Sequence, residues 1–519
     1  MRTALTLCLL TGCSESAVGW RSALYPDDWA PGFAVDDAAL HDFSYAGYHN
    51  GPELPDVVPG PTVSVLDHGA DPTGGSDSTA AIQAAIDAIA PTGGVVWLPA
   101  GEYRVDDLLE VTAPGTVLRG DGPDATFLWF TRTDGMTDRA HLTFRGAVRD
   151  GAETPLVSDA ATLGTTVEVD STDLEPGDDV ALGWVVTDEW VDDHGMTGTW
   201  TIANGAWRGF FRRTVLDVDR SGDPVVVTLD VPHRYDALLR DSASLRVQSG
   251  TLREVGVQGL SVSTVTDWDT AWTIERSHAI LFDGVADGWV ADVASFESPN
   301  SSDGRARHLM TGGVKVLRSK RVTVAETDLG FPQNRGEGGS GYLYEISQSS
   351  DVLTRDAVAR NGRHNFIQNW DFGTTGCVWL RTHSEGGRAY FAIWDPVGQL
   401  GYSEFHHSLA MANLIDASST DDGWQAANRH DYSTGAGITA TGSVFWNTGG
   451  TGKLNSWQFG LGYVIGTGPD LNVSTSLGFF DPISRRPEGT APEDWLEGEG
   501  TADLLMPQSL YDDQLSRRR

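Results

Sequence analysis

Residues 63–105 constrain the fold of this 519-residue chain more than any other stretch. Residues 63–65 alternate as in a strand, and a glycine-rich turn follows them. Asp77 or Ser78 can then cap a helix. The apolar side of that helix is formed, at helical spacing, by Ile82, Ala85, Ile86 and Ile89. Further strand-like runs follow within 95–105, so the pattern predicts a short helix that lies between strands and buries one face.

This stretch resembles the N-terminal segment of the pectate-lyase superfamily, the group of polygalacturonase-like, rhamnogalacturonase-like and epimerase-like β-helices. The matching residues are Asp67, Gly69, Ala70, Asp77, Thr79, Ala81, Ile82, Gln83, Ala85, Ile86, Asp87, Gly93, Gly94, Leu98, Pro99, Ala100, Gly101 and Tyr103. The resemblance implies an all-β protein, a right-handed parallel β-helix (solenoid) with an N-terminal capping helix. Because these residues serve the cap, the resemblance bears on the fold and the substrate class and leaves the reaction open.

From residue 255 onward, short strand-like segments that end in Gly, Asn or Asp recur roughly every 25 to 35 residues. This spacing is typical of a solenoid, in which each coil buries its inward residues against its neighbours. The segments are 257–262, 289–296, 321–324, 352–358, 377–381, 409–414 and 442–447. Between about 130 and 252 the rhythm gives way to alternating strands, which predict a small antiparallel β insertion that walls one side of a groove.

The chain therefore divides into six predicted segments. They are a lipoprotein signal peptide (1–13), a tether and extended N-terminal segment (14–61), the β-helix N-terminal cap and first coils (62–129), the antiparallel β insertion (130–252), the main parallel β-helix (253–475), and a C-terminal tail and cap (476–519). The aromatic residues of the second segment are expected to pack on the body. The short helix near the C-terminus is expected to cover the final strand edge.

The first residues predict export. A basic residue and a short apolar stretch precede small residues and Cys13, and this stretch is too short to span a bilayer. Residues 10–13 resemble the lipobox of bacterial lipoproteins, which implies acylation of Cys13 and a lipid-anchored protein. Ser14 favours the outer membrane or cell surface. An ordinary secretory signal with an incidental cysteine remains the alternative. With a lipid on Cys13, Cys377 would have no disulfide partner.

The charge of the chain excludes one class of partner. Acidic residues number 72 against 36 basic ones, which gives a formal net charge of −36. Such a surface repels phosphate backbones, so we expect no nucleic-acid partner. Acidity also keeps an exported protein soluble, and this is the simpler explanation. Calcium is a candidate cofactor because carboxylates are available, but the sequence contains no ligand loop of recognisable spacing.

Titratable and aromatic residues crowd together between 363 and 447. His364, His383 and His406 are separated by 19 and 23 residues, close to one short coil each, so stacked coils would bring them to one face. We therefore expect a polysaccharide groove here. The predicted catalytic residues are His364, Asp371, His383, Glu385, Arg388 and His406. The predicted substrate-binding residues are Arg363, Trp370, Trp394, Trp424, Arg429 and His430.

Two reactions fit these residue types. In a lyase, a neutral His or Arg removes the proton alpha to a uronate carboxylate while an arginine or a bound calcium stabilises the enolate. In a hydrolase, two carboxyls flank the glycosidic oxygen, chosen from Asp371, Glu385, Glu404, Asp416 and Asp422. An anionic substrate requires a basic patch, which could be formed by Arg360, Arg363, Arg381, Arg388 and Arg429. The alternative is a noncatalytic carbohydrate-binding or adhesive surface lipoprotein, because each polar residue taken singly is more often structural.

Overall fold

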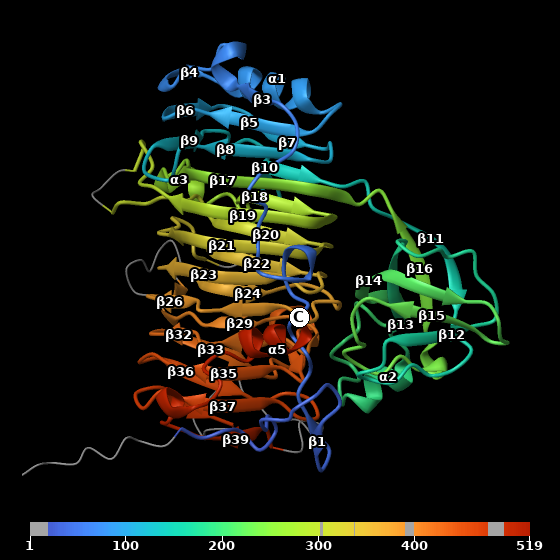
Figure 1. Ribbon diagram of the computed structural model, residues 1–519. Coiled ribbons are helices and arrows are strands. Elements are labelled where there is room, and N and C mark those ends of the chain that lie inside the picture. Colours follow the sequence, from blue (N-terminus) through green and yellow to red (C-terminus); the bar gives the residue numbers. More distant parts are fainter. Residues whose placement is uncertain (1–18, 302–304, 337, 390–398, 476–492) are drawn as a thin grey trace, which may run out of the picture.

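The computed structural model describes residues 19–301, 305–336, 338–389, 399–475 and 493–519. Parallel strands stack along one axis from the N-terminal helix α1 (Thr79–Ile89) to β39 (Trp495–Glu497), and a smaller antiparallel module projects from the side (Figure 1). The protein is thus a parallel β-helix with a lateral insertion, as the sequence predicts. No described helix is long and apolar enough to cross a membrane.

Two walls of parallel strands form the solenoid. Sheet 1 has ten strands in the spatial order β7 (Leu109–Val111), β10 (Ala140–Arg145), β18 (His278–Asp283), β20 (Gly312–Leu317), β22 (Tyr342–Ser347), β24 (His364–Gln368), β29 (Ser403–Phe405), β33 (Gly423–Ala426), β36 (Lys453–Ser456) and β38 (Asn472–Ser474). Sheet 2 runs through β3 (Thr62–Ser64), β5 (Gly94–Leu98), β8 (Thr116–Gly120), β17 (Leu252–Thr264), β19 (Val285–Ser295), β21 (Lys320–Gly330), β23 (Leu353–Arg360), β25 (Val378–Leu380), β31 (Leu414–Asp416), β35 (Val444–Thr448), β37 (Tyr463–Thr467) and β39.

The long strands of sheet 2 bend, and their second halves form another wall, the second arm of sheet 2. This arm contains β4 (Thr73–Asp77), β6 (Gly101–Val105), β9 (Thr126–Phe130), β26 (His383–Glu385) and β32 (Ser419–Thr420). Short pairs complete the strands: β1 (Ala34–Val35) with β2 (Ala38–Ala39), β27 (Arg388–Ala389) with β28 (Gln399–Leu400), and β30 (Ala410–Met411) with β34 (Ala440–Thr441). The other helical segments are η1 (Tyr48–Asn50), η2 (Val65–His68), η3 (Leu239–Asp241), η4 (Ala502–Leu504), α2 (Asp188–Asp193), α3 (Trp268–Ala271), α4 (Tyr432–Gly435) and α5 (Leu510–Arg518).

The bend in sheet 2 depends on one residue per coil with a positive φ angle. Asp292 in β19 (φ 53°), Glu326 in β21 (φ 54°) and Asp356 in β23 (φ 51°) occupy the same register position in successive strands. The left-handed conformation turns the chain through a corner there and interrupts the alternation of side chains. The position continues along the stack with Gly259, Arg381, Ala417, Asn447 and Gly466.

The inward face of each coil is apolar. Phe144, Phe282, Val316 and Ile346 are partners in register in sheet 1 and are all buried in one continuous core. Helix α1 closes the N-terminal end of this core, and its buried residues are the predicted Ile82, Ala85, Ile86 and Ile89. The helix prediction is therefore confirmed. Asp77 accepts the hydrogen bond from the backbone N–H of Thr79, as expected of a capping side chain.

The insertion is a sheet of six antiparallel strands. They are β11 (Arg149–Pro155), β12 (Thr166–Val169), β13 (Asp179–Val185), β14 (Trp207–Asp219), β15 (Val225–Leu229) and β16 (Ser244–Ser249). The antiparallel prediction is confirmed, but its start at residue 130 is wrong. Residues 140–145 form β10, which pairs in parallel with β7 and β18 and belongs to the solenoid.

Both ends of the described chain pack against the outer face of sheet 2. Leu24, Tyr25, Trp29 and Phe43 of the N-terminal segment share an apolar cluster with α5 and with outward residues of sheet 2 such as Val378. The C-terminal helix thus lies along the flank of the stack, beside the N-terminal segment, instead of over the last strand edge (Figure 1). The reason is its apolar face, because Leu510, Tyr511 and Leu515 find a matching apolar surface on the flank.

A shared apolar cluster fixes the insertion to the solenoid. Trp190 and Trp200 of the insertion contact Phe372 of the body edge-on, with ring centroids 5.3 Å apart in each pair. The same cluster includes Leu409, Met411 and Ile438 of the body. The seam between the two parts is therefore built like a protein core.

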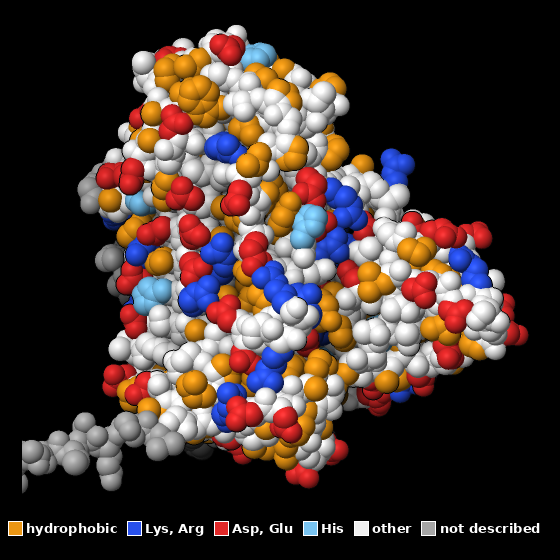
Figure 2. Space-filling view, in the orientation of Figure 1, with side chains coloured by type: hydrophobic (Ala, Val, Ile, Leu, Met, Phe, Trp, Pro, Cys, Tyr) orange, Lys and Arg blue, Asp and Glu red, His pale blue; other side chains and the backbone are white. Residues whose placement is uncertain are grey.

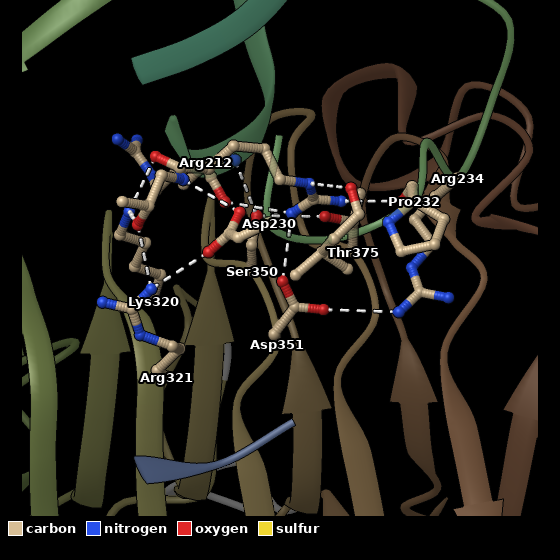
Figure 3. Close-up of polar contacts among 12 residues, drawn as sticks. Arg212, Asp230, Pro232, Arg234, Lys320, Arg321, Ser350, Asp351 and Thr375 are labelled. Carbon is tan, nitrogen blue, oxygen red and sulfur yellow. Dashed lines mark hydrogen bonds and ion pairs between the residues drawn. The ribbon is translucent and has the colours of Figure 1, made fainter. Parts of the chain in front are cut away.

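Buried ion pairs also cross this seam (Figure 3). Asp351 of the body lies 3.0 Å from Nη1 of Arg213 and 3.4 Å from Nη2 of Arg234, and all three side chains are almost fully buried. Nζ of Lys320 lies 2.7 Å from Asp179 of the insertion, and burial lowers the pKa of this lysine to about 8. The seam thus combines apolar packing with charges that are largely shielded from water.

Candidate functional site

A cleft opens along the seam between the insertion and the solenoid. It consists of two adjoining hollows, of about 220 Å³ and 250 Å³, which share Arg208, Gln348 and Asp371 as lining residues. Arg208 belongs to β14 of the insertion, whereas the other two belong to corners of the solenoid. On the face shown in Figure 2, basic side chains gather where the insertion joins the stack. The walls of the cleft come from two packed but separate sheets, and ligand pockets commonly lie at such interfaces.

The first hollow carries an aromatic platform. Trp370 is 42% exposed, and its ring stacks on His407 with centroids 4.1 Å apart. Trp200 and Ile202 of the insertion line the opposite side. Nε of Arg208 donates to Oδ1 of Asp371 at 3.0 Å and so joins the insertion to the solenoid at this hollow. An exposed indole beside a carboxylate and a guanidinium suits a sugar ring, because carbohydrates stack on aromatic faces and bond through their hydroxyls.

The second hollow is basic. Its lining contains four arginines and two aspartates, namely Arg208, Arg212, Arg246, Arg318, Asp150 and Asp371. Nε of Arg212 donates to the carbonyl of Gln348 and Nη1 to Oε1 of Gln248, both at 2.8 Å, and no described carboxylate forms an ion pair with it. Burial lowers the pKa of Arg212 to about 10, so its charge persists at neutral pH. The other three arginines are paired, Arg208 with Asp371, Arg246 with Glu153 and Arg318 with Asp283. Arg212 is thus the lining arginine whose charge no described carboxylate pairs with.

A second group of titratable side chains, the Glu404 cluster, lies buried at sheet 1. It consists of His364, Glu404 and His406 together with Arg363 and Arg429. Oε1 of Glu404 lies 3.3 Å from Nδ1 of His364 and 3.5 Å from Nε2 of His406, while Oε2 accepts from Nη1 of Arg429 at 2.7 Å. Burial opposes ionisation of Glu404, but attraction to Arg429 and its other neighbours holds its pKa below the ordinary value. The cluster joins two predicted catalytic histidines, but less than a tenth of either is exposed.

His383 and Glu385 form a third, separate group. They lie in β26, on the second arm of sheet 2, where Nε2 of His383 is 3.8 Å from Glu385 and 3.9 Å from Asp421. Each coil contributes strands to more than one wall, so a residue 19 positions after His364 lies on another wall. The expectation that the three histidines share one face is therefore wrong.

Further predicted residues also lie elsewhere. Trp424 is 1% exposed and faces the core, where it stacks near Phe366, so it cannot contact a sugar. Asp416 caps α5, accepting from Ser509 and from the N–H of Tyr511, and burial raises its pKa to about 7. The buried Asp422 accepts from Ser384 and Asn365. These carboxylates are structural, since their oxygens are already satisfied within the fold.

The predicted arginine patch does not form. Arg360 pairs with Asp328 and Glu385 on the second arm, and Arg381 pairs with Asp356 and Asp512 beside α5. Arg363 and Arg429 belong to the Glu404 cluster, and Arg388 lies in the pair of strands β27 and β28. His430 follows Arg429 in a loop. Trp394 and Cys13 lie outside the described residues.

The cleft arginines and Trp200 were missed by sequence reasoning. Trp200, Arg208, Arg212 and Arg246 lie more than 100 residues before the predicted groove, in the insertion, for which the sequence predicted only a role as a wall. Arg318 lies in the solenoid, between β20 and β21. A signal was present, because residues 207–213 read Trp-Arg-Gly-Phe-Phe-Arg-Arg, a basic and aromatic run in an acidic chain. Of the predicted residues, Trp370 and Asp371 do line the cleft.

The fold and its N-terminal cap define a pectate-lyase-like parallel β-helix protein. Residues 62–189 match the family described as rhamnogalacturonase A/epimerase, pectate lyase-like. A 43-residue stretch is 67% identical to the mannuronan C5-epimerase AlgE3 of Azotobacter vinelandii. That match covers 8% of this chain and 2% of the relative. These matches support the superfamily assignment and assign no residue roles.

Solved structures with a related chain path include phage proteins. The tailspike gp54 of Acinetobacter baumannii bacteriophage AP22, in complex with capsular saccharide, is 12% identical and superposes with a TM-score of 0.46, covering 84% of this chain and 69% of that one. The tailspike gp49 of Pseudomonas phage LKA1 is 13% identical with a TM-score of 0.45, covering 84% and 78%. The A-module of the Azotobacter vinelandii epimerase AlgE4 is 14% identical with a TM-score of 0.28, covering 84% and 95%.

Proposed function

We propose that this protein binds and degrades an acidic polysaccharide in the cleft along the seam. The observation that carries the proposal is the combination of an exposed Trp370 with four arginines in two adjoining hollows. A uronate-type sugar presents an apolar ring face and a carboxylate, which match an indole and a guanidinium. The family match is consistent with this, because its description names rhamnogalacturonase and epimerase proteins.

The cleft residues can support chemistry on such a chain. Arg212 neutralises the sugar carboxylate, which makes the adjacent carbon acid easier to deprotonate. Asp371 then acts as the base in an elimination. In a hydrolysis, Asp150 and Asp371 act as the pair of carboxyls that flank the glycosidic oxygen. Elimination and hydrolysis differ in their products, so an assay separates them.

The test is incubation of the purified protein with a panel of acidic and neutral polysaccharides, monitored for unsaturated-uronate absorbance and for reducing ends. Growth of both signals indicates a lyase, and reducing ends alone indicate a hydrolase. Trp370→Ala and Arg212→Gln are expected to weaken binding of the acidic substrate by about tenfold or more. Arg360→Gln is the matched control, because Arg360 lies on the second arm. Equal binding by all three variants would exclude the cleft.

One observation favours a noncatalytic alternative. The described cleft carboxylates are already engaged, Asp371 by Arg208 and Asp150 by Nε2 of Gln248 at 2.9 Å. A carboxylate held by such partners is a weaker base than a free one. A protein whose cleft carboxylates do not act as bases would be a carbohydrate-binding or adhesive surface protein. Binding of the acidic polysaccharide without any product would establish it.

We also propose that the protein is exported and anchored to the outer membrane or cell surface through a lipid on Cys13. The support is the basic and apolar start of the chain, which ends in small residues before this cysteine. Expression with a labelled fatty acid is expected to label the wild-type protein and not Cys13→Ala. Equal labelling of the two, or no labelling of either, would remove the anchor from the proposal.

A further inference from the structure

The Glu404 cluster presents three ligand-type side chains to one another. Glu404 and His406 are two residues apart at the end of β29, so both point to the same side of the strand. His364 comes from the neighbouring parallel strand β24. One nitrogen or oxygen atom from each of the three side chains lies within 4.8 Å of the others. The cluster thus brings two imidazoles and a carboxylate to one point in the interior.

The hydrogen bonds of the rings determine which nitrogens carry protons. Nε2 of His407 lies 2.6 Å from the carbonyl of Ser433 and donates to it. In the neutral ring Nδ1 of His407 then accepts in its shorter contact, which is with His406, and only a longer contact of 3.2 Å joins it to Oδ1 of Asn369. Nδ1 of His406, 2.6 Å from Nδ1 of His407, is then the donor, which leaves a lone pair on Nε2 of His406. Nδ1 of His364 donates in the same way to the carbonyl of Tyr402 at 2.6 Å. Both rings therefore keep one bare nitrogen.

These bare atoms are buried without hydrogen-bond partners. Among the described residues, Nε2 of His364, Nε2 of His406 and Oε1 of Glu404 have none. Nε2 of His406 and Oε1 of Glu404 face each other at 3.5 Å, and His364 approaches the same oxygen with its Nδ1 at 3.3 Å. Two unpaired buried acceptors this close are costly, and a positive ion beside them would relieve that cost.

The spacing of these atoms selects what fits between them. Nε2 of His406 and Oε1 of Glu404 are 3.5 Å apart. A direct hydrogen bond would bring them to about 2.7–3.2 Å, and a bridging water would hold them about 4.5 Å apart. Two ligands on a tetrahedral zinc ion are separated by about 3.4 Å, because each lies about 2.0–2.1 Å from the metal. The observed distance is close to that between two ligands of one zinc ion.

We propose that His364, Glu404 and His406 bind a divalent transition-metal ion, with Zn²⁺ as the representative. Nitrogen donors select such ions over calcium and magnesium, which require mainly oxygen ligands. Both histidines donate their other ring N–H to a neighbouring acceptor, as metal-bound histidines commonly do. Arg429 occupies Oε2 of Glu404 and leaves Oε1 for the ion. This site is separate from the cleft arginines, and the inference does not depend on the proposed function.

The test measures metal binding directly. The wild-type protein, treated with a chelator and then titrated with Zn²⁺ or Co²⁺, is expected to bind one ion per chain in this cluster. Bound Co²⁺ should give the visible spectrum of a low-coordinate nitrogen and oxygen site. Metal is also expected to raise the melting temperature, because an ion that binds only the folded state stabilises it.

Variants locate the ion. His406→Ala and the conservative Glu404→Gln should each remove the high-affinity ion. His383→Ala is the matched control, because His383, Glu385 and Asp421 form a second group of ligand types that is partly exposed. Failure of the wild-type protein to bind Zn²⁺ or Co²⁺ would overturn the proposal even if the variants do not fold. Retention of the ion by Glu404→Gln, or its loss in His383→Ala alone, would also overturn it. None of these three results bears on sugar binding in the cleft.

Discussion

Asp351 shows how much a single residue can matter at the seam. Its carboxylate holds Arg213 and Arg234 of the insertion where water is excluded. Burial raises the pKa of Asp351 and lowers that of Arg213, while their mutual attraction opposes both shifts. Loss of one partner from such a group leaves an uncompensated charge in the interior.

Asp351→Asn is therefore expected to lower the free energy of unfolding by about 3–5 kcal/mol. The measurement is urea denaturation followed by fluorescence. Glu326→Gln serves as the control, because the Glu326 side chain is 63% exposed and pairs with Arg355 at the surface. That change should cost less than about 1 kcal/mol. Similar costs for the two variants would contradict the buried role of Asp351.

Two tryptophans of the same predicted groove have opposite roles. Trp424 is 1% exposed in the core, whereas Trp370 is 42% exposed in the cleft. Trp424→Ala is expected to cost about 3–5 kcal/mol of stability, and Trp370→Ala less than about 1 kcal/mol. Thermal denaturation of both variants checks this contrast. A large loss of stability in Trp370→Ala would show that its ring serves packing instead of a ligand.

At the scale of the elements, the corner of sheet 2 is the most demanding feature. One residue in each of several successive coils adopts a positive φ angle, and most of these residues are not glycine. Asp, Asn and Glu carry part of this series, which keeps the corner polar and exposed. Ala417, at φ 46°, has no polar side chain to compensate for the strain of the left-handed conformation.

Ala417→Gly is expected to leave the stability unchanged or to raise it by up to about 1 kcal/mol. Ala291→Gly, one position before the corner in the extended part of β19, should instead lower it by about 0.5–1 kcal/mol. Paired denaturation curves compare the two. A loss of stability in both variants would show that the corner places no special demand on Ala417.

At the scale of the whole molecule, buried histidines make the fold sensitive to acid. Burial lowers the pKa of His41 and His141 to about 3, and that of His194, His233, His308 and His364 to about 4. In the unfolded chain these rings titrate near their ordinary value of about 6.5. Between pH 6.5 and 4 the unfolded state therefore binds more protons than the folded state, and stability falls as the pH falls. Asp416, Asp351 and Asp292, whose pKa values are raised mainly by burial, act in the opposite direction, but they are fewer than the six histidines.

The denaturation midpoint is accordingly expected to drop steeply between about pH 6.5 and 4.5. His141→Leu should reduce this slope, because His141 stacks on Phe130 in the core and neither of its ring nitrogens has a described hydrogen-bond partner. His68→Leu, at an exposed position, should leave the slope unchanged. A midpoint that is constant across this range would contradict the interpretation.

The sequence by itself determined the fold class. Helical spacing predicted the buried face of α1, strand-like segments predicted the coils, and alternation predicted the antiparallel strands of the insertion. These features depend on local periodicity, which a single segment already contains. Trp370 and Asp371, which line the cleft, were also named from the sequence as site residues, and that role stays a prediction.

Only the tertiary structure decided how the site residues group. Each coil contributes strands to different walls, and loops of different lengths separate them, so the spacing of His364, His383 and His406 could not show which wall each one joins. The sequence also could not show that Trp424 points into the core, because the side to which it points depends on the register of β33. Arg208 meets Asp371 from 163 residues away. Such contacts arise when the insertion packs on the solenoid, and no local pattern in the sequence records that packing.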